Sequence, residues 1–354
     1  MRAHAVVLVL LIIVLPWSVW GDTSDTPDLV SFSFDAPSAV NYVPNGFLEH
    51  VQDTIFAPHN NWFPLIRFIG EGEGSSIEVD ALSYGHDADR SLFEFFFSVG
   101  VGAQGLPETD VANEVPADDR YSDLYASNKN GDNTQIYDGD GSSAEILGLL
   151  ENASTNLDGV DMRSMGTQDL LYWSVSRETA ETENPYAAAV TSGADIFVGE
   201  SSDGYSTALP LTVYAQAWDL GLTGSDDVDA LVVIDPLADG LFDPAVDFIY
   251  YSLVDGSTSL LASGVPPFLG AGPADVFQVG GGVLTPTRAA SAAELGLRAT
   301  DELDALDLAV REEILIALPE PEGTGALLVG AGLVLWLASL RGSQTRWPSP
   351  ERTE

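Results

Sequence analysis

Oxygen-bearing side chains are densest in one stretch of the chain, residues 128–140. This stretch holds three aspartates, Asp132, Asp138 and Asp140, together with asparagines and glycines. Calcium takes about 6–8 oxygen ligands from carboxylates, amides and carbonyls, so these aspartates are candidate calcium ligands. The spacing is not that of an EF-hand, because Leu149 stands where the bidentate glutamate belongs if the loop begins at Asp138. A solvated turn rich in Asp and Gly is the alternative.

Other motifs that could support catalysis are weak. Gly100–Gly105 spells G-x-G-x-x-G after an apparent strand, but Leu106-Pro107-Glu108 follows instead of a helix, so we do not predict a dinucleotide site. Adjacent acid pairs such as Asp118-Asp119 are expected from composition alone in a chain with 54 acids. No serine-elbow motif accompanies the three histidines beyond the N-terminal segment, His50, His59 and His86. The sequence therefore predicts a protein that is not an enzyme, and a secreted glycan hydrolase is one alternative.

Composition excludes several functions. The chain has 54 Asp and Glu against 13 Lys and Arg, a net charge of −41, and Lys129 is its only lysine. Such a chain repels phosphate backbones, so nucleic-acid binding is not expected. It has no cysteine, which excludes disulfides, thiol nucleophiles and thiolate metal sites. Its 15 Phe, 11 Tyr and 7 Trp can build a core.

Tryptophan is also a candidate binding residue. Trp62, Trp173 and Trp218 could each offer a flat ring on which a glycan stacks. Tryptophan is more often a core residue, so packing is the alternative for each.

Four short signals recur in the same order along residues 22–318, about every 75 residues. The first is an apolar-Asp-Ala-Leu segment, with its aspartate at Asp80, Asp158, Asp229 and Asp304. The second is an aromatic-rich strand with a central serine, at Ser33, Ser98, Ser174 and Ser252. The third is Asp-apolar-aromatic, at Asp123, Asp195 and Asp275, with a stretched copy at Asp53. The fourth is Leu-Gly-Leu, centred on Gly148, Gly221 and Gly296.

These signals predict a mostly β fold with four internal repeats. The strand-like segments are rich in aromatic and branched residues and are followed by turn formers. A propeller-like ring is favoured, because the chain opens on the serine strand and its last clear signal is Leu303–Leu306, which can supply the first unit's missing strand. Tandem β-sandwiches and an open array are the alternatives. A polar residue at the same place in every unit is more often a turn cap than a ligand, so the recurring aspartates are predicted to be structural.

The sequence predicts an export signal at each end of the chain. Residues 1–21 have the layout of a secretory signal: charged start, apolar centre and neutral cleavage region. Residues 319–354 contain Pro319-Glu320-Pro321, an uncharged apolar run over 325–340, and arginines from Arg341 onward. This order resembles the PEP-CTERM sorting signal of bacterial exported proteins. The resemblance implies a transient membrane anchor, cleavage near the Pro-Glu-Pro by an exosortase-type transpeptidase, and association with extracellular polysaccharide or biofilm.

Together these features predict an exported bacterial protein with an acidic ectodomain over residues 22–318 and a membrane-sorting segment over 319–354. The expected role is a non-catalytic surface or extracellular-matrix protein. A calcium- or glycan-binding surface module and a secreted glycan hydrolase are the alternatives. No cofactor is expected other than calcium.

Overall fold

The computed structural model describes much of residues 30–308: 30–33, 55–57, 65–68, 79–83, 95–101, 103–105, 107–116, 120–127, 133–139, 147, 149, 155–164, 169–183, 192–201, 212–262 and 267–308. The chain divides into two compact units, Met1–Ala309 and Val310–Glu354. Every described residue lies in the first unit, so the signal over 1–21 and the sorting segment over 319–354 lie outside the described residues.

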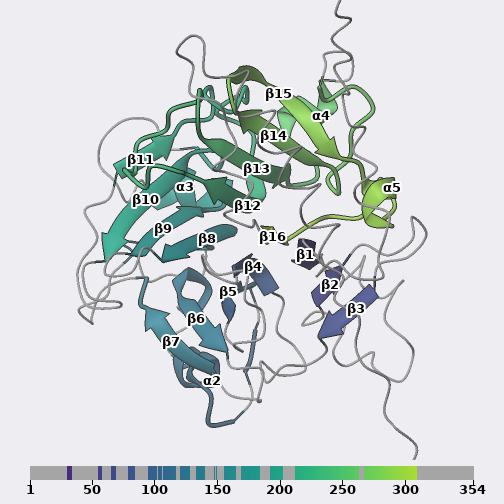
Figure 1. Cartoon of the computed structure of the whole chain (residues 1–354). Helices are drawn as coiled ribbons and strands as arrows, with labels where there is room; N and C mark the ends of the chain where they lie inside the picture. Colours follow the sequence, from purple (N-terminus) through teal and green to yellow (C-terminus); the bar gives the residue numbers. More distant parts are fainter. Residues whose placement is uncertain are drawn as a thin grey trace, which may run out of the picture. The chain divides into compact units, whose positions relative to one another are not determined.

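The first unit is built from four 4-stranded antiparallel sheets, as the repeats predict (Figure 1). The first sheet has the order β16 (Ala305–Leu308), β1 (Val30–Ser33), β2 (Ile55–Ala57), β3 (Leu65–Phe68). The second is β4 (Val79–Ser83), β5 (Phe95–Val99), β6 (Leu124–Ser127), β7 (Asn133–Tyr137). The third is β8 (Gly159–Ser164), β9 (Asp169–Ser174), β10 (Ile196–Ser201), β11 (Thr212–Ala215). The fourth is β12 (Val228–Ile234), β13 (Phe248–Leu253), β14 (Val276–Gly280), β15 (Val283–Ala290).

Helical segments are short and lie in the connections between strands. They are α2 (Asp110–Glu114), η4 (Arg120–Ser122), α3 (Arg177–Glu183), α4 (Thr258–Leu261) and α5 (Ala292–Leu295). The helix α2 begins five residues after Gly105 and has only five residues itself. The prediction that Gly100–Gly105 does not open a helix is therefore confirmed.

The prediction that a strand near the end of the repeat array completes the first sheet is confirmed. The late strand β16 pairs antiparallel with the early strand β1, from Val30 opposite Leu308 to Ser33 opposite Ala305. The innermost strands also contact one another in cyclic order, β4 to β8, β8 to β12, β12 to β16 and β16 to β4. Each sheet remains a separate open sheet, since no described strand pairing joins one sheet to the next.

A buried serine links each sheet to the next. The hydroxyl groups of Ser33, Ser98, Ser174 and Ser252 all donate to the carbonyl oxygen of the residue just before a first-signal aspartate. The acceptors and distances are Val79 (2.7 Å), Leu157 (2.8 Å), Val228 (3.3 Å) and Leu303 (2.9 Å), in the same order. The fourth bond returns from the last sheet to the first. Tandem sandwiches or an open array would leave that fourth bond unmade, so the propeller-like arrangement accounts for the second signal.

The core repeats as well, through an aromatic pair between the second and third strands. In the strand register of the first sheet, Phe32 is opposite Phe56. The facing residues in the other three sheets are Phe97 and Tyr125, Trp173 and Phe197, and Tyr251 and Phe277. In the last three pairs the ring centroids lie 5.7, 6.1 and 5.7 Å apart with interplanar angles of 33, 34 and 32°. Directly opposed aromatic residues stabilise a sheet beyond the area they bury. These pairs explain why an aromatic residue precedes each serine and follows each third-signal aspartate.

Candidate functional site

The third-signal aspartates hold the start of the third strand of a sheet. In the third sheet, Asp195 accepts backbone N–H bonds from Ser192 (3.0 Å) and from Ala217 (2.8 Å). In the fourth sheet, Asp275 accepts the equivalent bonds from Gly272 (3.0 Å) and Ala292 (2.6 Å). Each carboxylate therefore ties the turn before its strand to the segment after the fourth strand. The prediction that these aspartates are structural caps is confirmed.

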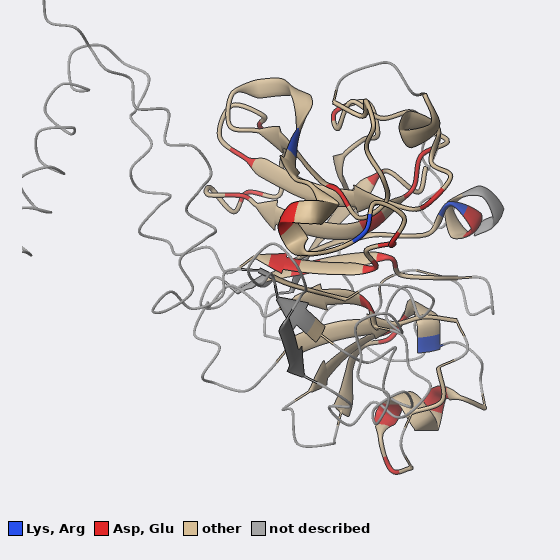
Figure 2. Cartoon of the chain, turned by 90° about the vertical axis from the view of Figure 1, so that its right-hand side faces the viewer, with Lys and Arg blue, Asp and Glu red and all other residues tan. Residues whose placement is uncertain are grey.

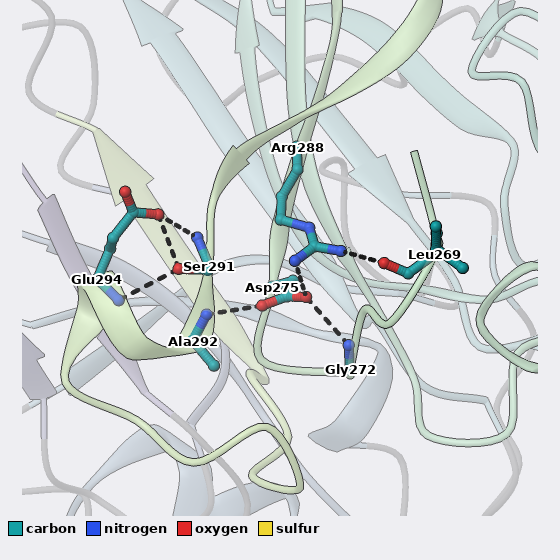
Figure 3. A network of polar contacts seen from close by, with 7 residues as sticks. All are labelled: Leu269, Gly272, Asp275, Arg288, Ser291, Ala292 and Glu294. Atoms are coloured by element: carbon teal, nitrogen blue, oxygen red, sulfur yellow. Dashed lines mark hydrogen bonds and ion pairs between the residues drawn. The ribbon is translucent and has the colours of Figure 1, made fainter. Parts of the chain in front are cut away.

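Figure 3 shows how this cap is supported in the fourth sheet. The guanidinium of Arg288 lies 3.6 Å from the Asp275 carboxylate and donates to the carbonyl oxygen of Leu269 at 2.9 Å. Beside it, Ser291 and Glu294 form a reciprocal capping box at the start of α5. Every side chain in this network bonds to a backbone group or to a neighbouring side chain, and together these contacts fix the turns around β14 and β15.

Asp123 occupies the equivalent place in the second sheet, with more side-chain partners. Its carboxylate accepts from the backbone N–H of Gly139 (2.8 Å), the Tyr125 hydroxyl (3.0 Å) and the Gln135 amide (2.8 Å). Burial nevertheless raises the pKa of Asp123 to about 7, and the negative charge of Asp138 adds to the increase. Asp123 and Asp138 are therefore close enough to interact electrostatically.

The first-signal aspartates form a second recurring set, which we call the inner-strand aspartates: Asp80, Asp158, Asp229 and Asp304. Each follows directly the residue whose carbonyl accepts the serine bond, so all four occupy equivalent positions where an inner strand begins. The side-chain nitrogen of Asn156 donates both to Asp80 (2.7 Å) and to Asp158 (2.6 Å). Two acids from different sheets are thereby brought to one amide group.

Like charges surround Asp158. Its side chain is buried, and burial is the main reason why its pKa lies well above the usual value. The negative charges of Asp227, Asp80 and Asp229 raise this pKa further, while the Asn156 bond lowers it. Desolvation and neighbouring carboxylates both favour the protonated form of an acid. The arrangement can therefore hold a proton where the inner strands meet.

Of the three predicted calcium ligands, the structure describes one. Asp138 is half-buried at the end of β7, whereas Asp132 and Asp140 lie outside the described residues. Within the described ranges no group of three or more His, Asp or Glu side chains is arranged to hold a metal ion. The calcium assignment for Asp132, Asp138 and Asp140 stays a prediction.

A buried acid–tyrosine cluster lies between the third and fourth sheets and was not predicted. The Tyr172 hydroxyl donates to Asp235 at 2.9 Å, and the Tyr214 hydroxyl donates to Asp247 at 3.0 Å. Burial raises the pKa of Asp247 to about 6, with Asp235 and Asp239 adding negative charge. Asp235 also accepts backbone N–H groups of its own turn, Leu237 at 3.0 Å and Ala238 at 2.7 Å. The two Asp-Pro dipeptides at 235–236 and 243–244 marked these turns in the sequence, but nothing marked their tyrosine partners.

Two further turn caps were missed. Asp226 accepts the backbone N–H of Thr223 (2.7 Å) and Asp301 accepts that of Arg298 (2.8 Å), each three residues before an inner-strand aspartate. The constant spacing to Asp229 and Asp304 was the signal that could have revealed them. Figure 2 shows where the acids lie: Asp and Glu recur along turns and strand ends, and Lys and Arg are few among the coloured residues.

The three candidate tryptophans have different surroundings. Trp173 is fully buried against Phe197, so its assignment as a possible glycan platform was wrong and its role is packing. Trp218 is 64% exposed, and Trp62 lies outside the described residues. Of the three, Trp218 is the one shown to face solvent.

His50, His59 and His86, and the sorting motif Pro319, Glu320, Pro321 and Arg341, lie outside the described residues. The apolar run 325–340 lies there too, and the helices that are described are all too short or too polar to cross a membrane.

Comparisons with known proteins find only distant similarity. No protein-family model and no curated protein matches the chain. Among solved structures, an ancestral GH74 enzyme is 10% identical with a TM-score of 0.24, over 68% of this chain and 22% of that enzyme. YCF48 bound to D1 peptide is 10% identical with a TM-score of 0.22, over 67% of this chain and 76% of that protein. This chain spans about a fifth of the length of the GH74 enzyme that it matches.

Proposed function

We propose that this protein is an exported, non-catalytic surface or extracellular-matrix protein, anchored briefly at the membrane and sorted through its C-terminal segment. The observation that carries the proposal is the use of the recurring polar residues. The serines donate to backbone carbonyls of the next sheet, and the capping aspartates accept backbone N–H groups of their own sheet. The recurring serines and the capping aspartates therefore hold neighbouring sheets together and fix the turns of each sheet.

The same bonding argues against catalysis by these groups. A carboxylate that accepts a backbone N–H on each oxygen, as Asp195 and Asp275 do, is held in place and poorly available as a nucleophile or base. A buried serine that donates to a carbonyl has no adjacent base to activate it. The recurring residues therefore favour a scaffold over the hydrolase alternative.

The C-terminal segment supplies the cellular part of the proposal. The Pro319-Glu320-Pro321 motif, the apolar run 325–340 and Arg341 resemble a PEP-CTERM signal, so an exosortase-type transpeptidase is the expected partner. A bilayer core requires about 20 apolar residues in a helix, so the 16-residue run suits a temporary anchor. Extracellular polysaccharide is the expected environment after sorting, as the resemblance implies.

A C-terminal epitope tag tests this proposal in a bacterial host that has an exosortase. We expect the ectodomain at the cell surface without the tag, and a triple alanine variant of residues 319–321 in the membrane fraction with the tag retained. A host lacking the exosortase serves as the control and should also retain the tag. Ectodomain found in the cytoplasm, or a tag retained equally by both proteins, would contradict the proposal.

Calcium binding is the second candidate function, favoured by the proximity of Asp123 and Asp138. The negative charge of Asp138 raises the pKa of Asp123, and Asp138 begins the part of the loop that contains Asp140. A cation bound by this loop would relieve that repulsion and stabilise the folded state. We expect a Tm several degrees higher in calcium than in chelator, and a smaller difference for Asp138→Asn. An identical Tm in both conditions would exclude the candidate.

A further inference from the structure

Trp218 combines large exposure with a rigid setting. It is 64% exposed and is the only aromatic residue among the large exposed apolar side chains that the structure describes. Exposing an indole forgoes the favourable burial of a large apolar surface, so its position in solvent calls for an explanation. An exposed ring on a fixed backbone suits binding, because less conformational freedom is then lost when a ligand docks.

The turn that carries Trp218 is held on every side. Ala217 donates its N–H to Asp195 at 2.8 Å, and Gln216 donates its N–H to Asp219 at 3.0 Å. Leu220 is fully buried, and its carbonyl oxygen accepts from the Tyr251 hydroxyl at 2.9 Å. These contacts fix the backbone on both sides of the indole without using the indole itself.

The fourth sheet provides an internal control for this turn. Ala292 donates to Asp275 as Ala217 donates to Asp195, and the two following glycines, Gly221 and Gly296, have positive φ angles of 72° and 81°. The carboxylates of Asp219 and Glu294 also accept equivalent N–H bonds, from Gln216 (3.0 Å) and Ser291 (2.8 Å).

This alignment places Ala293 where the third sheet has Trp218. Ala293 is also exposed, and its segment has equivalent hydrogen bonds and an equivalent glycine of positive φ, although residues 292–295 are the helix α5 and residues 217–221 a turn. The architecture therefore does not require an indole at this position.

Charge and neighbouring groups define the ligand. With a net charge of −41, the chain repels anions, which disfavours acidic polysaccharides and anionic lipid surfaces. The C–H bonds on one face of a neutral sugar ring are weakly positive and pack on the negative face of an indole. The half-buried side chains of Gln216 and Asp219 flank the indole in sequence and offer an amide and a carboxylate to sugar hydroxyls.

We propose that Trp218 is the stacking platform of a binding site for a neutral polysaccharide, with Gln216 and Asp219 as its polar neighbours. This goes beyond the proposed surface role and does not depend on the sorting signal, so tag retention and glycan binding can fail separately. Binding at one platform is weak, and repeated sugar units along a polymer give it effective strength through multivalency.

Affinity electrophoresis of the full chain in mild detergent tests the site. Gels contain hydroxyethyl cellulose, galactomannan, dextran or, as the acidic comparison, alginate. We expect at least one neutral polymer to retard the protein, alginate not to do so, and Trp218→Ala to weaken the retardation about tenfold. Trp218→Phe, which keeps an aromatic ring, should retain part of it. Leu284→Ala removes another large side chain, 71% exposed, and should leave retardation unchanged.

Several results would overturn the site. One is that no neutral polymer retards the native protein, and another is equal retardation of the native protein and Trp218→Ala. Binding to polylysine that disappears in 0.5 M salt, with no retardation by neutral polymers, would instead identify a cationic partner. Alanine occupies the equivalent position 293, so we expect Trp218→Ala to have the same Tm as the native protein. An equal Tm shows that weaker binding by this variant is not caused by unfolding.

Discussion

The capping aspartates Asp123, Asp195 and Asp275 and the four inner-strand aspartates both recur along this chain, but their hydrogen-bond partners differ. Asp195 and Asp275 each accept backbone N–H groups on both carboxylate oxygens. Asp158 is buried among other carboxylates, and its pKa is raised well above the usual value. Recurrence thus identifies residues that matter to every unit, while the neighbours of each residue decide whether it binds backbone N–H groups or lies among like charges.

This difference has a direct energetic meaning. The N–H donors of Ser192 and Ala217 favour the ionised form of Asp195, but burial outweighs them and raises its pKa. What Asp195 contributes is therefore an acceptor for two backbone N–H groups. Burial and negative neighbours disfavour the ionised form, so Asp158 is best accommodated when neutral. Removing the side chain of a capping aspartate should therefore destabilise the fold by leaving backbone N–H groups without an acceptor, whereas removing only the charge of Asp158 should relieve repulsion.

Truncating a capping aspartate should have the largest effect. Asp195→Ala leaves the N–H groups of Ser192 and Ala217 without their acceptor inside a closed turn. Each unsatisfied buried donor costs about 1–3 kcal/mol, so we expect a loss of about 3 kcal/mol in the free energy of unfolding. Denaturant unfolding measures this, with Asp255→Ala at an exposed position as the control. Equal losses for the two variants would refute the capping role.

The serine bonds between sheets should have a smaller effect. Ser252→Ala removes the bond to the Leu303 carbonyl, which links the fourth sheet to the first beside the inner-strand aspartate Asp304. A lost buried hydrogen bond of this kind costs about 1–2 kcal/mol. Ser98→Ala, at the equivalent bond to Leu157, should lose a similar amount in the same unfolding experiment. A loss at Ser98 with none at Ser252 would contradict the cyclic arrangement.

The raised pKa values predict that acidification stabilises the protein. The pKa of Asp123 is about 7 and that of Asp247 is about 6, both above the ordinary 3.8, so the folded protein binds more protons than the unfolded chain. The contribution of these groups is fully present below pH about 4 and is lost as the pH rises through about 6 to 7. We expect a Tm a few degrees higher at pH 5 than at pH 8, measured in 0.5 M salt to screen general repulsion. A Tm that rises from pH 5 to pH 8 would contradict the assigned surroundings.

Much of the fold was predictable because local signals and long-range contacts coincide. Ser252 and Leu303 lie far apart in the sequence, yet each belongs to a signal with a fixed place in its repeat, so their pairing follows from the order of signals. The pairing of β16 with β1 was predictable in the same way, because the first unit lacked one strand.

The site was less predictable, for a physical reason. Trp173 is buried in the strand β9, whereas Trp218 is exposed in a turn. The residue type is the same in both places, so it does not predict which indole faces solvent. The raised pKa of Asp158 depends on acids supplied by other segments, which no local pattern shows. The tyrosines that bind Asp235 and Asp247 belong to the neighbouring third sheet, and no repeated signal marks these pairs.

Asp158→Asn tests most directly the claim that repulsion from neighbouring carboxylates destabilises the charged form of Asp158. The amide has the same shape, carries no charge, and can still accept the bond from Asn156. Melting of the native protein and this variant at pH 5 and pH 8 should show a higher Tm for the variant at pH 8 and little difference at pH 5. A variant that is less stable than the native protein at pH 8 would show that Asp158 works as a charged residue, and the account would be wrong.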